Sequence, residues 1–198
     1  RKILVPIDFS ETGMLALEHA SFMARLAKAY LLLLHVLPVQ EYHFEIPEPV
    51  MRIENHDEVN RIVDQKLSET IDRVRNTYGC VAKSLSTRGK VSHEIMEIAQ
   101  EEKVDLIVMG THGAAGFEEF FLGSNAHKVV TVAPCPVITV QTHAKKLGFS
   151  NIVLPIDRTM HSREKVEVAI TLANLFASKI HIVGLLEELD SHEEDKLN

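Results

Sequence analysis

The chain has 198 residues, 45% of them hydrophobic and 25% charged, with a formal net charge of −7 at pH 7. That share of apolar residues excludes a disordered chain, and the negative charge disfavours nucleic acid or an anionic membrane as the main partner. The longest apolar run, residues 30–37, is much shorter than the ~20 residues of a membrane-spanning helix, so we expect no membrane segment. Two cysteines and no signal-peptide pattern predict a cytoplasmic protein with reduced thiols.

The first predicted element is a buried strand over residues 2–7, KILVPI, which ends at the turn-prone DFSETG. A helix follows over residues 11–29, because small and apolar residues recur there every three or four positions. Ser10 or Thr12 can cap its first turn. Residues 30–37, YLLLLHVL, are apolar on both faces, which is typical of a parallel strand covered by helices on both sides.

The same alternation continues after a loop that contains prolines. The further elements predicted are a helix over 51–78, a strand over 80–87, a helix over 91–102, a strand over 104–110, a helix over 124–133 and a strand over 137–140. Strands that alternate with helices predict an α/β fold, here an open five-stranded parallel sheet with helices on both faces, as in Rossmann-like proteins.

A repeat follows the fifth strand. Residues 151–157, NIVLPID, match residues 2–8, KILVPID, and the alignment continues without a gap at an offset of 149. We therefore predict a domain over 1–142, a linker over 143–150 and an incomplete second repeat, β-α-β, over 151–198. About 48 residues cannot bury a core alone, which favours a chain cut from a longer tandem protein.

The stretch GTHGAAGFEEFFLGSN, residues 110–125, leads from a strand into a helix with the spacing Gly-x2-Gly-x9-Gly-Ser. Glycine-rich turns that place main-chain N–H groups at a helix N-terminus bind phosphate well. Ligands of open α/β sheets lie beyond the carboxyl ends of the strands, which is where Asp8, Val36 and Gly110 fall. Two simpler interpretations stay open: the loop only turns the chain, and Asp8 caps a helix.

No metal site is expected from the eleven histidines, because none is seen to form an i, i+4 pair with an acid. Glu118 and Glu119 in the loop would repel phosphates unless they face solvent or share a cation.

Together, KILVPIDFSETG, LLLHVL, DLIVMGTHGAAGFEEFFLGSNAHKVV and APCPVITV resemble the universal stress protein family, over residues 2–140 and, in an incomplete copy, from 151 to about 186. The glycine spacing is similar to that of the family's ATP-binding branch. The resemblance implies a sheet of the adenine nucleotide alpha hydrolase-like type and bound ATP or AMP, with Mg²⁺ or Mn²⁺ possible at the phosphates. It also implies a homodimer formed through strand 137–140.

The resemblance further implies a role for each matching residue. Asp8 would bind the ribose or adenine side with Ser10 beside it, and Val36 would meet adenine through its backbone. Pro6 and Met109 would line the base and ribose. The phosphates would be held by Gly110, Gly113, Gly123, Ser124 and Asn125, although many relatives carry an apolar residue where Asn125 stands.

The function expected is a nucleotide-binding module for stress response or signalling rather than an enzyme. No Walker lysine precedes the loop, so ATP hydrolysis would at most be slow and metal-dependent. Three alternatives stay open. They are an adenylating or phosphatase relative, a phospho-acceptor receiver domain, and a structural or signalling protein of the same fold that binds no nucleotide.

Overall fold

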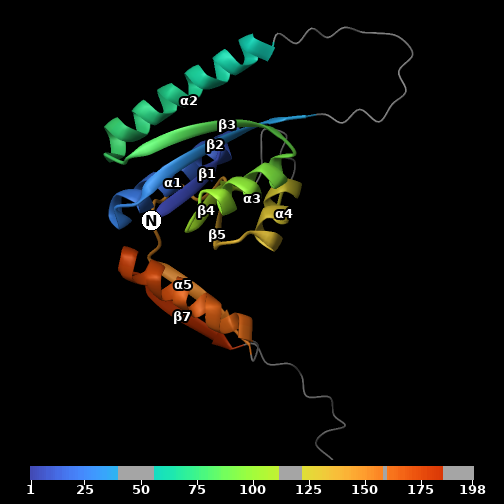
Figure 1. Ribbon diagram of the computed structural model, residues 1–198. Coiled ribbons are helices and arrows are strands. Elements are labelled where there is room, and N and C mark those ends of the chain that lie inside the picture. Colours follow the sequence, from blue (N-terminus) through green and yellow to red (C-terminus); the bar gives the residue numbers. More distant parts are fainter. Residues whose placement is uncertain (40–55, 112–121, 158–159, 185–198) are drawn as a thin grey trace, which may run out of the picture. The chain divides into compact units, whose positions relative to one another are not determined.

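The computed structural model describes residues 1–39, 56–111, 122–157 and 160–184, and the chain divides into two compact units, Arg1–Leu147 and Gly148–Asn198. The first unit runs, in chain order, through β1 (Lys2–Pro6), α1 (Glu11–Ala27), β2 (Tyr30–Pro38), α2 (His56–Tyr78), β3 (Ala82–Gly89), α3 (Val91–Glu101), β4 (Leu106–Gly110), α4 (Ser124–Val132) and β5 (Val137–Val140). All neighbouring strands are parallel, in the order β3-β2-β1-β4-β5. The predicted five-stranded α/β sheet is confirmed (Figure 1).

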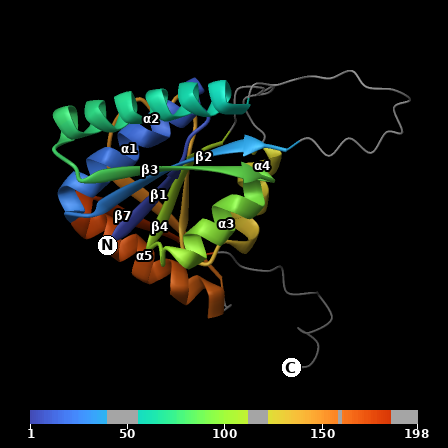
Figure 2. The same cartoon turned by 45° about the horizontal axis from the view of Figure 1, so that its top comes forward.

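Helices cover both faces of this sheet. Helices α1 and α2 contact each other on one face, and α3 and α4 contact each other on the opposite face (Figure 2). The central strands are therefore buried on both sides, and their apolar runs form the core: Leu4, Val5, Leu31, Leu33, Leu34, Ile107 and Val108 are all fully buried. Two-sided burial explains why these strands do not alternate between apolar and polar residues.

Helix α1 packs closely because its buried face is made of small residues. Ala16, Ala20 and Met23 are at most 1% exposed, as their spacing predicted. Ser10 is the N-cap, and its hydroxyl accepts a hydrogen bond from the Gly13 N–H at 3.1 Å. The helix ends at Lys28, which adopts the left-handed conformation.

Helix α2 buries one apolar stripe, except near its start. Val63, Leu67, Ile71 and Val74 are buried, whereas Val59 is 36% exposed. The described helix begins at His56, and the predicted start at residue 51 lies outside the described residues.

Two strands begin later than predicted. Strand β3 spans Ala82–Gly89 rather than 80–87, and β4 begins at Leu106 rather than at 104. The end of α3 explains the second shift, because the Val104 N–H still donates to the Ala99 carbonyl at 2.9 Å and Lys103 has a φ of 49°. A left-handed residue that returns the chain to a helix carbonyl is a helix C-terminus and not yet a strand.

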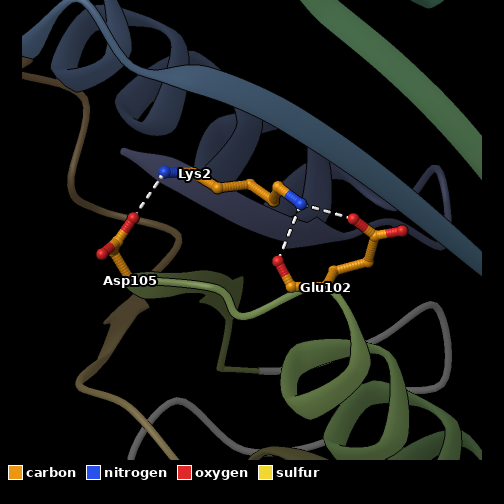
Figure 3. Close-up of polar contacts among 3 residues, drawn as sticks. All are labelled: Lys2, Glu102 and Asp105. Atoms are coloured by element: carbon orange, nitrogen blue, oxygen red, sulfur yellow. Dashed lines mark hydrogen bonds and ion pairs between the residues drawn. The ribbon is translucent and has the colours of Figure 1, made fainter.

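Polar contacts at the amino edge of the sheet join β1, α3 and β4 (Figure 3). The Lys2 ammonium donates to the Glu102 carbonyl oxygen at 2.7 Å and forms an ion pair with the Glu102 carboxylate. The Lys2 backbone N–H donates to Asp105 Oδ2 at 2.7 Å, and the Asp105 N–H returns a bond to the Lys2 carbonyl at 3.0 Å. This edge is held by side chains that are distant in sequence.

The second unit contains β6 (Asn151–Ile156), α5 (Met160–Phe176) and β7 (Lys179–Gly184), with the two strands parallel. Its details reproduce β1-α1-β2 at the offset of 149. Lys28 and Ala177 have φ values of 50° and 53°, and the hydrogen bonds from Ala29 N to Ala24 O and from Ser178 N to Ala173 O are both 2.9 Å.

One face of the β6–β7 pair differs from its counterpart. Leu4 and Leu34 are 0% exposed in the first unit, whereas the residues at the same places in the second, Val153 and Val183, are 66% and 45% exposed. The described part of the second unit has no equivalent of α3 and α4 to cover them.

Candidate functional site

The candidate site lies at the carboxyl ends of β1 and β4, in the middle of the sheet. From β1 the chain crosses to β2 on one side, and from β4 it crosses to β5 on the other. The loops leaving these two strands therefore diverge and open a crevice, which is where open α/β sheets bind ligands.

The turn after β1 is organised around the Asp8 carboxylate. Asp8 Oδ1 accepts hydrogen bonds from the Ser10 N–H at 3.0 Å and from the Ser10 hydroxyl at 2.5 Å. Gly13 lies close beside it, because an added Cβ would be 2.7 Å from Asp8 Oδ1 and the carboxylate would have to shift. The Ser10 hydroxyl thus serves both Asp8 and the start of α1, and the helix cap is Ser10 rather than Asp8.

Gly110, the last residue of β4, lies against the first turn of α1. A Cβ at this position would be 3.0 Å from the Thr12 carbonyl carbon and 3.2 Å from the Gly13 nitrogen. These are backbone atoms that cannot rotate away. Gly110 therefore has a packing role that the sequence did not show, which is the close approach of β4 to α1.

The other side of the crevice is the start of α4. Gly123 is its N-cap residue, and the Gly123 N–H donates to the Thr111 carbonyl at 2.8 Å. The first intrahelical bond is that of the His127 N–H to Gly123 O, so the N–H groups of Ser124 and Asn125 have no partner within the helix. Both residues are exposed. Gly113 lies outside the described residues.

The remaining predicted residues come together on the face of the sheet that α3 and α4 cover. Val36 and Met109 belong to the core cluster that includes Ile95 of α3 and Val129 of α4. Pro6 is half-buried and, two residues after Leu4 on the same strand, faces the same side. All three lie at or near the carboxyl ends of their strands, which is the end of the sheet where the crevice opens.

An aromatic cluster that the sequence patterns do not indicate packs against the turn after β1. The His35 and Phe9 rings lie 5.1 Å apart between centroids, and the Lys66 ammonium lies 5.5 Å from the Phe9 ring centroid. His35 Nδ1 is 2.7 Å from the Ile7 carbonyl oxygen. A histidine near the end of an otherwise apolar strand was the only signal in the sequence.

The expectation about histidine pairs is wrong at one place. His93 and Glu97 of α3 form an i, i+4 pair with 3.6 Å between Nδ1 and Oε2, and Glu94 adds a second carboxylate oxygen 3.9 Å from the same Nδ1. These three residues form a group that could hold a cation. They lie on a single helix, and the His93 side chain is 65% exposed.

A polar cleft of about 410 Å³ lies on the α2 side of the ends of β2 and β3. Its lining residues are Leu37, Asn60, Asp64, Ser86, Thr87 and Arg88. Arg88 donates a hydrogen bond to Asn60 Oδ1 at 2.8 Å across it. Among the described residues, none of those predicted to bind the nucleotide lines this cleft.

Both cysteines are unpaired thiols. Burial raises the pKa of each thiol, and for Cys135 the nearby Asp105 charge raises it further. Thiols with a raised pKa are poor nucleophiles, so neither suits covalent chemistry.

Among the helices that the structure describes, none combines the length and the apolar character that a membrane span requires.

Known proteins resemble this chain in sequence and fold. The universal stress protein YxiE of Bacillus subtilis is 32% identical over 145 residues, which cover 71% of this chain and 98% of that protein. The crystal structure of a universal stress protein from Archaeoglobus fulgidus has a TM-score of 0.75 and 20% identity, and the match covers 99% of this chain and 71% of that one. It shares the fold.

A further solved relative is described as a universal stress protein in complex with cAMP. Its TM-score is 0.55 at 21% identity, over 72% of this chain and 97% of that one. The model of the universal stress protein family itself matches residues 1–141, which are almost the whole first unit. The chain therefore belongs to the universal stress protein family.

Proposed function

We propose that the first unit binds an adenine nucleotide, ATP or AMP, at the carboxyl edge of its sheet. The observation that carries the proposal is the convergence of the Asp8 turn and the exposed start of α4 at the reversal of strand order. The family relative in complex with cAMP supports an adenine nucleotide as the ligand.

In this proposal the two ends of the nucleotide meet different chemistry. Asp8 accepts from the ribose hydroxyls, Ser10 orients Asp8, and the main chain of Val36 meets the base, with Pro6 and Met109 lining the apolar side. An anion at the start of α4 gains from unpaired N–H groups and from the helix dipole.

The phosphate end depends on main-chain groups more than on charged side chains. The Gly123 N–H is engaged by Thr111, so the donors proposed for the phosphates are the N–H groups of Ser124 and Asn125 and the Ser124 hydroxyl. In this proposal Gly110 and Gly123 act by allowing the phosphates to come close to the main chain. Gly113 completes the motif in sequence, with Mg²⁺ or Mn²⁺ proposed as the counter-ion.

Isothermal titration of ATP, AMP, cAMP and GTP, with and without Mg²⁺, tests the proposal. In Gly123→Val the side chain would enter the space beside the donors, while a φ of −55° and a ψ of 151° remain allowed for valine. Loss of two charged hydrogen bonds at ~1.5 kcal/mol each weakens ATP binding about 100-fold.

Gly184→Val is the matched control, because nothing lies within 4 Å of a Cβ added at this exposed position. It should bind ATP like the wild type. Wild-type protein that binds none of the four nucleotides, and that carries none after purification as judged by mass spectrometry, would refute the proposal and favour the alternative of a family member without a nucleotide.

We also propose that residues 151–184 are a second universal stress protein repeat. The support is the agreement of strand register, helix bounds and left-handed helix end at a constant offset. The β6–α5 turn carries Asp157, as β1–α1 carries Asp8, but Arg158 and Thr159 replace Phe9 and Ser10. For this reason no second complete site is proposed.

The edge strand β5 supports a homodimer, which remains a proposal. It is the outer strand of the first unit's sheet, and an unpaired strand edge is a template for pairing with another chain. Two exposed valines of α4, Val130 and Val132, add apolar surface on the helix that follows β4 and leads into β5.

A further inference from the structure

The His35 side chain forms a hydrogen bond with a backbone carbonyl oxygen at the point where β1 and β2 stop pairing. Its Nδ1 lies 2.7 Å from the Ile7 oxygen. A carbonyl can only accept, so Nδ1 carries the proton and donates. The backbone register between the two strands ends at the pair Pro6–Leu34, immediately before these residues.

Alternation along β2 shows which group the imidazole replaces. The Tyr30 N–H donates toward β1, to Arg1 O at 2.9 Å, and the Leu31 N–H donates toward β3, to Val81 O at 3.0 Å. Even-numbered N–H groups of β2 therefore point to β1. The last bond of this ladder runs from Ile7 N to Leu34 O at 2.8 Å.

If the ladder continued, the Val36 N–H would donate to the Ile7 carbonyl. Such a bond would make Ile7 and His35 a bridge pair, and the register contains no such pair. Beyond Ile7 the chain turns out of the strand, because Phe9 adopts a φ of 61° and its ring contacts the His35 ring. The N–H and C=O groups of Val36 therefore point to the side of β2 along which β1 no longer runs.

We propose that His35 is a positioning residue for the base of the nucleotide, an inference that rests on the proposed function. By taking the Ile7 carbonyl it keeps the N–H and C=O of Val36 available side by side. Adjacent donor and acceptor groups match the edge of adenine, which presents a ring nitrogen next to an amino group. Phe9 and Lys66 hold the imidazole and the turn in this arrangement.

Amide hydrogen exchange in nucleotide-free protein tests the structural half. In the wild type the Val36 amide should exchange at least about tenfold faster than the Leu34 amide, because Leu34 lies in the part of β2 that is paired with β1. In His35→Leu the Ile7 carbonyl becomes available, and Val36 should become protected. His93→Leu, the same change on an exposed helix face, should leave Val36 unchanged. A wild-type Val36 amide as protected as that of Leu34 would overturn the inference.

Titration separates the base end from the phosphate end. His35→Leu should weaken ATP binding about tenfold, the effect of one hydrogen bond, and leave the affinity for inorganic tripolyphosphate unchanged. His35→Asn, whose amide can donate near the position of Nδ1, should recover most of the ATP affinity. Equal ATP affinity in His35→Leu and wild type would overturn the positioning role. If wild type binds no nucleotide, the proposed function fails, and the exchange result still decides whether His35 replaces the Val36 amide.

Discussion

Replacing Gly13 with alanine tests whether the Asp8 carboxylate is held as the structure shows. The added Cβ would lie 2.7 Å from Asp8 Oδ1 and 3.2 Å from Ser10 Oγ. Both distances are shorter than the ~3.5 Å at which non-bonded heavy atoms make favourable contact. The carboxylate must therefore move, and its two hydrogen bonds to Ser10 lengthen.

Two effects of opposite sign set the magnitude. Alanine is better than glycine within a helix by up to ~1 kcal/mol. The two weakened bonds to Asp8 cost ~1 kcal/mol each, a low figure because Asp8 is exposed and solvent screens its charge. The free energy of unfolding should fall by about 1 kcal/mol, and ATP affinity should fall about tenfold because Asp8 no longer meets the ribose.

Urea unfolding and calorimetric titration measure the two effects separately. Gly79→Ala is the control: Gly79 has a φ of 67° and nothing lies within 4 Å of an added Cβ. Left-handed strain costs ~1–2 kcal/mol there, so stability falls by a similar amount while ATP affinity stays unchanged. If Gly13→Ala instead gains the full helix-propensity term and binds ATP like wild type, the tight contact between Gly13 and Asp8 does not exist.

Three further predictions concern other parts of the molecule. The hydrogen bond and charge of Lys2 lower the pKa of Glu102 from its ordinary value, so this carboxylate contributes stability that is lost as the pH falls through the lowered pKa. Glu102→Gln should therefore flatten the fall of the urea midpoint on acidification. Wild type should be a dimer in size-exclusion chromatography with light scattering, and a monomeric wild type would contradict the edge-strand dimer. Thr139→Pro should be a monomer with a similar urea midpoint. The reason is that the ladder bonds between β5 and β4 use even-numbered residues of β5, which leaves the Thr139 N–H on the outer edge of the sheet. Phosphate release from ATP should be slow and should stop when EDTA removes Mg²⁺ or Mn²⁺, whereas rapid release without metal would contradict a binding module.

Local patterns were sufficient for the architecture. Strands apolar on both faces alternate with helices that carry one apolar stripe, and this alternation leaves a parallel α/β sheet as the economical fold. The repeat at an offset of 149 was also visible, because an unbroken alignment of KILVPID with NIVLPID needs no three-dimensional information. The ends of the elements were predicted less accurately. Val104, for example, was predicted to begin a strand, but its N–H still bonds to α3 in the C-terminal turn of that helix.

The candidate site could be located from the sequence but not built from it. Glycines, Asp8 and Val36 mark the carboxyl edge of the sheet by their positions after strands, and a sequence shows those positions directly. Which of their main-chain groups are already engaged depends on the approach of segments far apart in the chain. The Gly123 N–H is used by Thr111, and the Ile7 carbonyl is used by His35.

The sequence by itself thus determined the element order, the sheet type, the family resemblance and the region of the site, since these follow from periodicity and motif spacing. Only the tertiary structure decided that Gly110 is needed for its contact with Thr12 and that His35 ends a backbone ladder. These contacts depend on strand register, helix docking and side-chain direction to within a fraction of an ångström, which a linear pattern of residue types does not encode.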